Sequence, residues 1–266
     1  GYLSATTDTR EAVLETDASF IVVPTPSEPD GAFSLKYVRA VAKDIGRALR
    51  EKSQWHLVAL ISTVMPGDTE SDLIPILESE SGKRCGVDFG VCYSPEFIAL
   101  GSVVRDFLNP DFVLIGESDP AAGEALNSIY SSVCDNSPPV QRMNLVNAEL
   151  AKLAINTYVT TKISFANTIA DICEQIDGAD VDVVTDAVGL DKRIGRRYLT
   201  GGAPFGGPCF PRDVTALTTY SQSVGVQPII AEATATENLY RSQHLVQLCL
   251  DQLPQGGAVG VLGLAY

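Results

Sequence analysis

The first half of the chain alternates short apolar runs with segments of helical periodicity, and this alternation constrains the fold most. The apolar runs lie at 19–23, 57–62, 89–93 and 112–115, and the first of them is rich in β-branched residues. Helical patterns separate or follow them at 35–52, 66–80 and 120–133. Strands that are apolar throughout are buried on both faces. The pattern therefore predicts a parallel sheet covered by helices on both sides.

A dinucleotide-binding sheet normally opens with a strand, a glycine-rich turn and a helix that receives the pyrophosphate. No such turn precedes residue 19. We therefore expect a truncated Rossmann-like sheet domain that lacks its first βα units. A different doubly wound sheet is the alternative.

The second half has a helical pattern. Residues 147–175 contain neither proline nor glycine, which predicts one helix about 45 Å long at 1.5 Å per residue. Two further helices are predicted at 212–223 and 229–253, and the apolar run 258–266 reads as a strand. We expect three parts: a sheet domain over 1–140, an all-helical dimerisation domain over 141–253, and the first strand of a second Rossmann-like domain over 254–266.

Composition excludes several classes of function. The net charge of −14 argues against nucleic acid or an anionic membrane as a partner. No uncharged apolar run of about 18 residues suggests a membrane span, and the start of the chain does not resemble a signal peptide. Six scattered cysteines without a CxxC pair predict a reducing compartment, the cytoplasm. The two histidines, His56 and His244, are not spaced as metal ligands, so we expect no metal site.

The segment 193–213, RIGRRYLTGGAPFGGPCFPRD, is the least ordinary part of the sequence. Glycine pairs let backbone N–H groups approach a ligand, and prolines stiffen the loop. Cys209 precedes a predicted helix, whose positive end and Arg212 would favour a thiolate nucleophile. Asp213 is close enough in sequence to orient a water molecule. The alternative is a structural cysteine in a Gly/Pro turn.

Two other groups of residues suggest binding or catalysis. The segment 192–197 concentrates four cations, Lys192, Arg193, Arg196 and Arg197, in an acidic chain. This suits a diphosphate or carboxylate ligand or, alternatively, a solvated helix end. On the long predicted helix, Lys152 and Asn156 share a face at i, i+4. They could stabilise an oxyanion, or Lys152 could extend to solvent.

These motifs together resemble the UDP-glucose/GDP-mannose dehydrogenase family. The matching blocks run along nearly the whole chain: VPTP at 23–26, STV at 62–64, SPEF at 94–97, AELAKLAIN at 148–156, FGGPCFPRD at 205–213 and VLGLAY at 261–266. The cysteine block is the most specific. The resemblance implies oxidation of a nucleotide-sugar alcohol to a carboxylate with two NAD⁺, through a thioester on Cys209, in a homodimer built on the long helix.

The resemblance also implies a role for individual residues. Lys152 and Asn156 match the oxyanion-stabilising pair, Asp213 and Thr63 match the residues that position water, and Glu96 matches the residue that assists thioester hydrolysis. The residues matched to substrate binding are Arg193, which would reach the partner's site, Tyr198, Phe205, Gly206, Gly207 and Phe97. Those matched to NAD binding are Thr25, Pro26 and Thr63.

Two other interpretations stay open at the level of sequence. The chain could be a catalytically silent fragment that dimerises and binds a nucleotide, because the glycine-rich turn is absent. It could also be a two-electron dehydrogenase of the 3-hydroxyacid type, although such an enzyme has no need for a cysteine in a glycine-proline loop. The identity of the sugar nucleotide is not encoded in these motifs.

Overall fold

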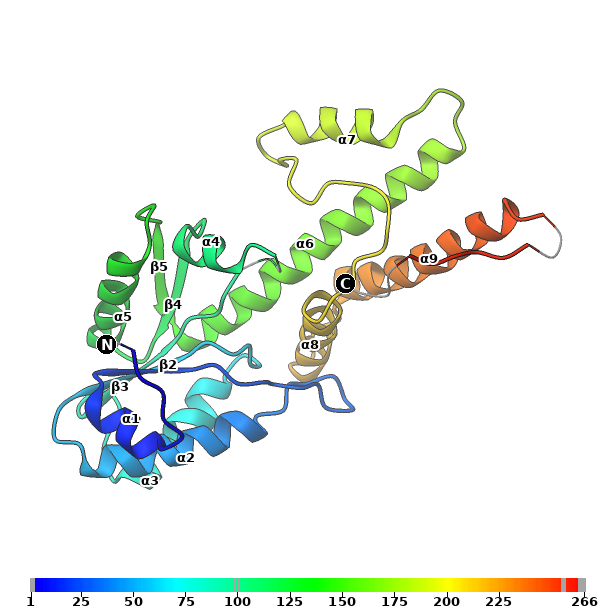
Figure 1. Cartoon of the computed structure of the whole chain (residues 1–266). Coiled ribbons are helices and arrows are strands. Elements are labelled where there is room, and N and C mark those ends of the chain that lie inside the picture. The colour runs from blue at the N-terminus through cyan, green and yellow to red at the C-terminus, as the bar shows by residue number, and fades with distance from the viewer. Residues whose placement is uncertain (1–2, 98, 100, 255–256, 263–266) are drawn as a thin grey trace. The chain divides into compact units, whose positions relative to one another are not determined.

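The computed structural model describes residues 3–97, 99, 101–254 and 257–262 (Figure 1). The chain divides into two compact units, Gly1–Lys152 and Leu153–Tyr266. The first unit contains a five-stranded sheet, and the second is formed by helices joined by irregular segments. The mixed α/β class predicted from the sequence is confirmed. Within the described residues, no helix combines the length and the apolar character that a membrane span requires.

The sheet of the first unit has the strand order β1-β2-β3-β4-β5. Its strands are β1 (Ala18–Ile21), β2 (His56–Leu60), β3 (Phe89–Tyr93), β4 (Val113–Glu117) and β5 (Val140–Asn144). β1, β2 and β3 are parallel neighbours, and β4 is parallel to β5. β3 and β4 are antiparallel, paired only at Cys92–Glu117 and Tyr93–Gly116.

The prediction of a fully parallel sheet is therefore wrong at one pair of strands. An apolar run records that a strand is buried on both faces, but it carries no information on the strand's direction. Direction depends on the path of the connection, whose described residues include one short helix, α4 (Val103–Leu108). The carboxyl ends of β1, β2 and β3 still share one edge of the sheet.

Helices cover both faces of this sheet. One face packs against α2 (Lys36–Glu51) and α3 (Ile74–Ser81), and the other against α5 (Pro120–Val133). The side chains of β2 alternate between the two cores: Val58 and Leu60 belong to the first, and Leu57 and Ala59 to the second. The predicted helix at 66–80 begins with a π-helical segment, η1 (Thr69–Leu73), before it continues as α3.

The second unit contains the later part of α6 (Leu145–Glu174), then α7 (Val181–Leu190), α8 (Phe210–Ser223) and α9 (Ile229–Asp251). The long helix predicted at 147–175 is confirmed as α6, with 30 residues. A small core of Phe205, Val214 and Ala231, with Ile163 and Phe210 packed against it, joins the helices to the loop before α8.

Some elements were not predicted from the sequence. They are the short helices α1 (Thr9–Glu15) and α4, helix α7, and strand β5. The strand predicted at 258–266 is not formed in the described residues 257–262, and residues 263–266 lie outside the described part. A single strand without a neighbour leaves its backbone groups unpaired, so an irregular path here is physically reasonable. The assignment of 254–266 to a further domain stays a prediction.

Candidate functional site

The segments that follow β1 and β2 are joined by hydrogen bonds at the carboxyl edge of the sheet. The Thr25 hydroxyl donates to the Thr63 carbonyl at 2.8 Å. The Ser62 hydroxyl accepts from the Val23 N–H at 2.9 Å and donates to the Val23 carbonyl at 2.6 Å. Thr25 is buried, whereas Pro26 is exposed. Thr25 and Thr63 are therefore held together where an open α/β sheet binds its ligands.

A buried carboxylate fixes the turn that follows Thr63. Glu149 has no solvent exposure and accepts the N–H groups of Gly67 at 2.5 Å and Thr69 at 2.9 Å. Burial raises the pKa of Glu149, and these hydrogen bonds oppose that rise. Asp68 accepts the Met65 N–H at 2.9 Å in the same turn, and burial raises its pKa to about 6. The turn at 65–69 is thus held by three hydrogen bonds from its backbone to the carboxylates of Glu149 and Asp68.

The SPEF segment after β3 is bound to α6 through Lys152. The Lys152 Nζ donates to the Glu96 carbonyl at 2.5 Å and lies 4.4 Å from the centroid of the Phe97 ring. Lys152 is only 7% exposed, so it does not extend to solvent. Burial raises the pKa of the Glu96 carboxyl, and the charge of Lys152 partly offsets this rise. An ammonium, an aromatic ring and a half-buried carboxyl group are thus gathered in the first unit.

In the second unit, Cys209 lies at the N-cap of α8 and is exposed. Its carbonyl accepts the Asp213 N–H at 2.9 Å in the first helical turn. The Asn156 amide on α6 donates to the Asp213 carboxylate at 2.6 Å, and both side chains are buried. Arg212 Nε is 4.0 Å from the same carboxylate. An accessible thiol, a carboxylate, an amide and a guanidinium therefore belong to one region.

The loop before α8 has conformations that restrict its sequence. Tyr198 has φ = +61°, a left-handed conformation that is rare outside glycine, and its ring packs edge-on against Phe210 at 6.2 Å between centroids. Gly207 has φ = +80°, which a side chain would strain. Phe205 is buried in the core of the second unit, and Gly206 follows it. The conformations of Tyr198 and Gly207 therefore restrict which residues can stand at these two positions of the loop.

Acidic neighbours neutralise part of the cation cluster at 192–197. The Arg193 side chain is 88% exposed and pairs with Asp191 at 2.6 Å. Arg196 pairs with Asp186 and donates to the Leu199 carbonyl. Within one chain, Arg193 therefore points to solvent rather than into a pocket, which is compatible with a target outside its own unit.

Sequence reasoning missed a group of polar side chains on α6 and α9. Arg241 pairs with Asp171 and is 3.6 Å from Glu174, while His244 lies 2.7 Å from Glu174. Three of these residues, Asp171, Glu174 and His244, could in principle offer metal ligands. The buried Arg241 guanidinium already neutralises the carboxylates, so we assign no metal site here.

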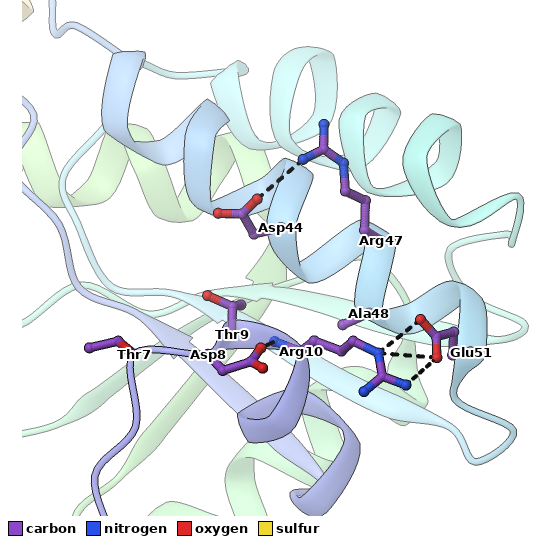
Figure 2. Close-up of a pocket in the computed structure, with 8 residues that line it drawn as sticks. All are labelled: Thr7, Asp8, Thr9, Arg10, Asp44, Arg47, Ala48 and Glu51. Carbon is purple, nitrogen blue, oxygen red and sulfur yellow. Dashed lines mark hydrogen bonds and ion pairs between the residues drawn. The ribbon is translucent and has the colours of Figure 1, made fainter.

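A surface cavity of about 490 Å³ lies between α1 and α2 (Figure 2). Arg10 binds Glu51 in a fork at 2.9 and 2.5 Å, and Arg47 reaches Asp44 at 3.5 Å. These charges are paired with one another, and acidic groups outnumber basic ones. The cavity therefore offers no cationic surface for a phosphate.

The structure thus brings the predicted site residues together in three groups: Thr25 with Thr63, Lys152 with Glu96 and Phe97, and Asn156 with Asp213 and the Cys209 backbone. That Lys152, Asn156 and Asp213 converge on the Cys209 sulfur stays a prediction.

Comparison with known proteins gives the family. Residues 1–134 match the NAD-binding domain of the UDP-glucose/GDP-mannose dehydrogenase family, and residues 146–240 match its central domain. The chain is 37% identical over 267 residues to a UDP-glucose 6-dehydrogenase of Haloferax volcanii, covering 99% of this chain and 62% of that protein. It is 39% identical over 271 residues to a GDP-mannose 6-dehydrogenase of Pseudomonas syringae pv. syringae, covering 100% of this chain and 60% of that protein.

Solved structures agree with these matches. A UDP-glucose dehydrogenase from the hyperthermophilic archaeon Pyrobaculum islandicum superposes with a TM-score of 0.86 at 41% identity, covering 96% of this chain and 57% of that one. The chain therefore spans about 60% of the length of the relatives it matches. Both domain matches and the motif order lead to one conclusion: the chain belongs to the UDP-glucose/GDP-mannose dehydrogenase family.

Proposed function

We propose that the full-length protein is an NAD-dependent nucleotide-sugar 6-dehydrogenase of the cytoplasm. It oxidises the primary alcohol of the sugar to a carboxylate in two steps, and the substrate is covalently bound to Cys209 between the first and the second oxidation. Residues 1–140 form the remaining part of the NAD-binding domain, 141–253 the dimerisation domain, and 254–266 the start of a further nucleotide-binding domain. The substrate is of the UDP-glucose or GDP-mannose type.

The cofactor binds at the carboxyl edge of β1, β2 and β3. Thr25 and Thr63 are fixed there by their mutual hydrogen bond, and exposed Pro26 follows them. NAD⁺, when bound, accepts one hydride in each of the two oxidations. Because the Thr25 hydroxyl donates to the Thr63 carbonyl, the role of Thr25 is to hold Thr63 in position at this edge of the sheet.

The second oxidation needs a covalent nucleophile. After the first hydride and the alcohol proton have left, the Cys209 thiolate adds to the aldehyde carbon and the carbonyl π electrons move to oxygen. Cys209 lies at the N-cap of α8 and is exposed, so its sulfur is accessible to the aldehyde. Lys152 and Asn156 stabilise the new oxyanion. Loss of a second hydride gives a thioester.

Hydrolysis of the thioester completes the reaction. Asp213 and Thr63 position the water, and Glu96 assists by accepting a proton from it. The raised pKa of Glu96, caused by burial, makes its carboxylate a stronger base than an exposed one. The C–S bond breaks as the C–O bond forms, and the electron pair returns to the Cys209 thiolate.

The loop before α8 and a second subunit complete substrate binding. The loop contacts the substrate through Tyr198, Phe205, Gly206 and Gly207. Phe97 lines the site next to Lys152. Arg193, exposed within its own chain, reaches the partner's site. A stripe of exposed apolar side chains on α6 supports a homodimer: Tyr158 is 65% exposed, Phe165 51% and Ile172 50%, at a spacing of seven residues.

The observation that carries this proposal is the exposed thiol of Cys209 at the start of α8, one turn before a buried Asp213 that binds Asn156. The test is to incubate the full-length protein with NAD⁺ and a panel of nucleotide sugars. We expect two NADH for each carboxylate formed from one or more of them. One NADH per product, or no turnover of any sugar nucleotide, contradicts the proposal.

A further inference from the structure

The loop before α8 has no regular secondary structure, yet several of its backbone polar groups are bound by side chains from distant helices. The segment GGAPFGG at 201–207 contains four glycines and one proline, a composition that confers conformational freedom on an isolated loop. A buried backbone group needs a partner, and no helix or strand supplies one here. The partners identify residues that no motif indicated.

Asn167 on α6 binds the first part of this loop with both ends of its amide. Its Oδ1 accepts the Gly202 N–H at 2.8 Å, and its Nδ2 donates to the Ala203 carbonyl at 3.3 Å. Asn167 has no solvent exposure. Close packing adds to this constraint, because a Cβ on Gly201 would lie 2.9 Å from the Ala166 carbonyl oxygen.

Asn238 on α9 binds the middle of the loop in the same two-ended manner. Its Oδ1 accepts the Phe205 N–H at 2.7 Å, and its Nδ2 donates to the Phe205 carbonyl at 3.0 Å. This pair of bonds resembles the pairing of one residue in a β-ladder and fixes both position and orientation of the Phe205 peptide groups. The Phe205 side chain is anchored separately in the core of the unit.

Arg241 lies three residues after Asn238, on the same face of α9. Its Nε donates to the Gly202 carbonyl at 2.6 Å, and the residue is only 3% exposed. Asp171 pairs with the guanidinium, and Glu174 lies nearby, which offsets the cost of burying the charge. Gly202, Ala203 and Phe205 thus form five hydrogen bonds with three side chains, two donated by the loop and three by the side chains.

We propose that Asn167, Asn238 and Arg241 are positioning residues that preform the substrate-binding loop before the nucleotide sugar arrives. The inference rests on the proposed function, in which Phe205, Gly206 and Gly207 contact the substrate. A loop that is ordered in advance loses less conformational entropy when the ligand binds. Removing the hydrogen bonds that order the loop therefore weakens substrate binding and leaves the covalent steps at Cys209 largely intact.

The test compares Asn238→Leu with Gln247→Leu in the full-length protein. Both changes replace an amide by an isobutyl group on α9, but Gln247 is exposed and donates to Asp251 on the same helix rather than to the loop. We expect Asn238→Leu to raise the KM for the nucleotide sugar at least tenfold, equivalent to about 1.4 kcal/mol. Its kcat should change less than threefold, and Gln247→Leu should match the wild type. A KM increase below threefold in folded Asn238→Leu, or a fall in kcat at unchanged KM, overturns the proposal.

Hydrogen–deuterium exchange separates this proposal from the proposed function. In Asn238→Leu the amide of Phe205 should exchange at least tenfold faster than in the wild type and in Gln247→Leu. An unchanged exchange rate of the Phe205 amide refutes the proposal that Asn238 holds the loop, whatever the enzyme's activity. A wild-type protein that oxidises no nucleotide sugar refutes the proposed function, and the exchange result then still decides whether the loop is held. If Asn238→Leu does not fold, Asn238→Ser removes the two-ended bond with a smaller side chain, and the same criteria apply.

Discussion

His56 makes the stability of the first unit depend on pH in a predictable direction. The imidazole is fully buried at the start of β2. Its Nδ1 is 3.1 Å from the Thr16 carbonyl and its Nε2 2.9 Å from the Ser19 hydroxyl. A carbonyl can only accept, so Nδ1 carries the proton and Nε2 accepts from Ser19. The neutral ring is fully hydrogen-bonded in the folded state.

Burial, with a contribution from the charge of Lys52, lowers the pKa of His56 from 6.5 to about 4. The unfolded chain therefore binds a proton below pH 6.5 that the folded chain does not bind until about pH 4. The stabilisation is complete above pH 6.5 and is lost as the pH falls through this window. Between pH 7.5 and pH 5, linkage gives a loss of about 2 kcal/mol.

The assay is urea unfolding followed by the fluorescence of Trp55, the one tryptophan of the chain, which neighbours His56 in the first unit. The His56→Gln variant cannot titrate in this range, so it controls for every other group that ionises between the two pH values. We expect the wild type to lose about 2 kcal/mol more than His56→Gln between pH 7.5 and pH 5. Equal losses in both proteins refute the reasoning.

Three further predictions concern the site and the assembly. Asn156→Leu removes the donor of the 2.6 Å hydrogen bond to buried Asp213 and should lower the free energy of unfolding by about 2 kcal/mol. The double variant Asn156→Leu/Asp213→Leu should lose less stability than the sum of the two single variants, and additive losses contradict an interaction between the two side chains. Glu96→Gln in the full-length enzyme should slow hydrolysis so that the thioester accumulates in quenched samples; equal loss of both oxidations contradicts its role. Phe165→Asp on the exposed stripe of α6 should convert a dimer into a monomer by light scattering, and an already monomeric wild type at micromolar concentration refutes the dimer.

Much of the fold is predictable because burial leaves a periodic signature in the sequence. β3 and α5 begin and end at the predicted residues, since their apolar patterns are bounded by polar residues and by Pro120. β5 escaped prediction because VQRMN is a mostly exposed edge strand without an apolar run. α7 escaped because its sequence, VDVVTDAVGL, is rich in β-branched valine, which favours strands when tertiary contacts are unknown.

The residues of the site also differ in how far the sequence predicts them. Cys209, Asp213 and Asn156 stand in compact motifs, which indicated them as site residues, whereas the direct hydrogen bond between Asn156 and Asp213 is visible only in the structure. Asn167, Asn238 and Arg241 carry no comparable signal, because a polar residue on a helix gives no indication of which distant loop it binds. The buried state of Lys152 was equally beyond sequence reasoning, since a lysine in an apolar stretch can also extend to solvent.

The central claim is that Cys209 carries the substrate between the two oxidations. The most direct measurement is the mass of the Cys209-containing peptide after acid quenching of the full-length protein during turnover with NAD⁺ and its nucleotide sugar. The account predicts an acyl adduct on Cys209 that requires NAD⁺, and no carboxylate product from Cys209→Ser. Carboxylate formation at the wild-type rate by Cys209→Ser would contradict it.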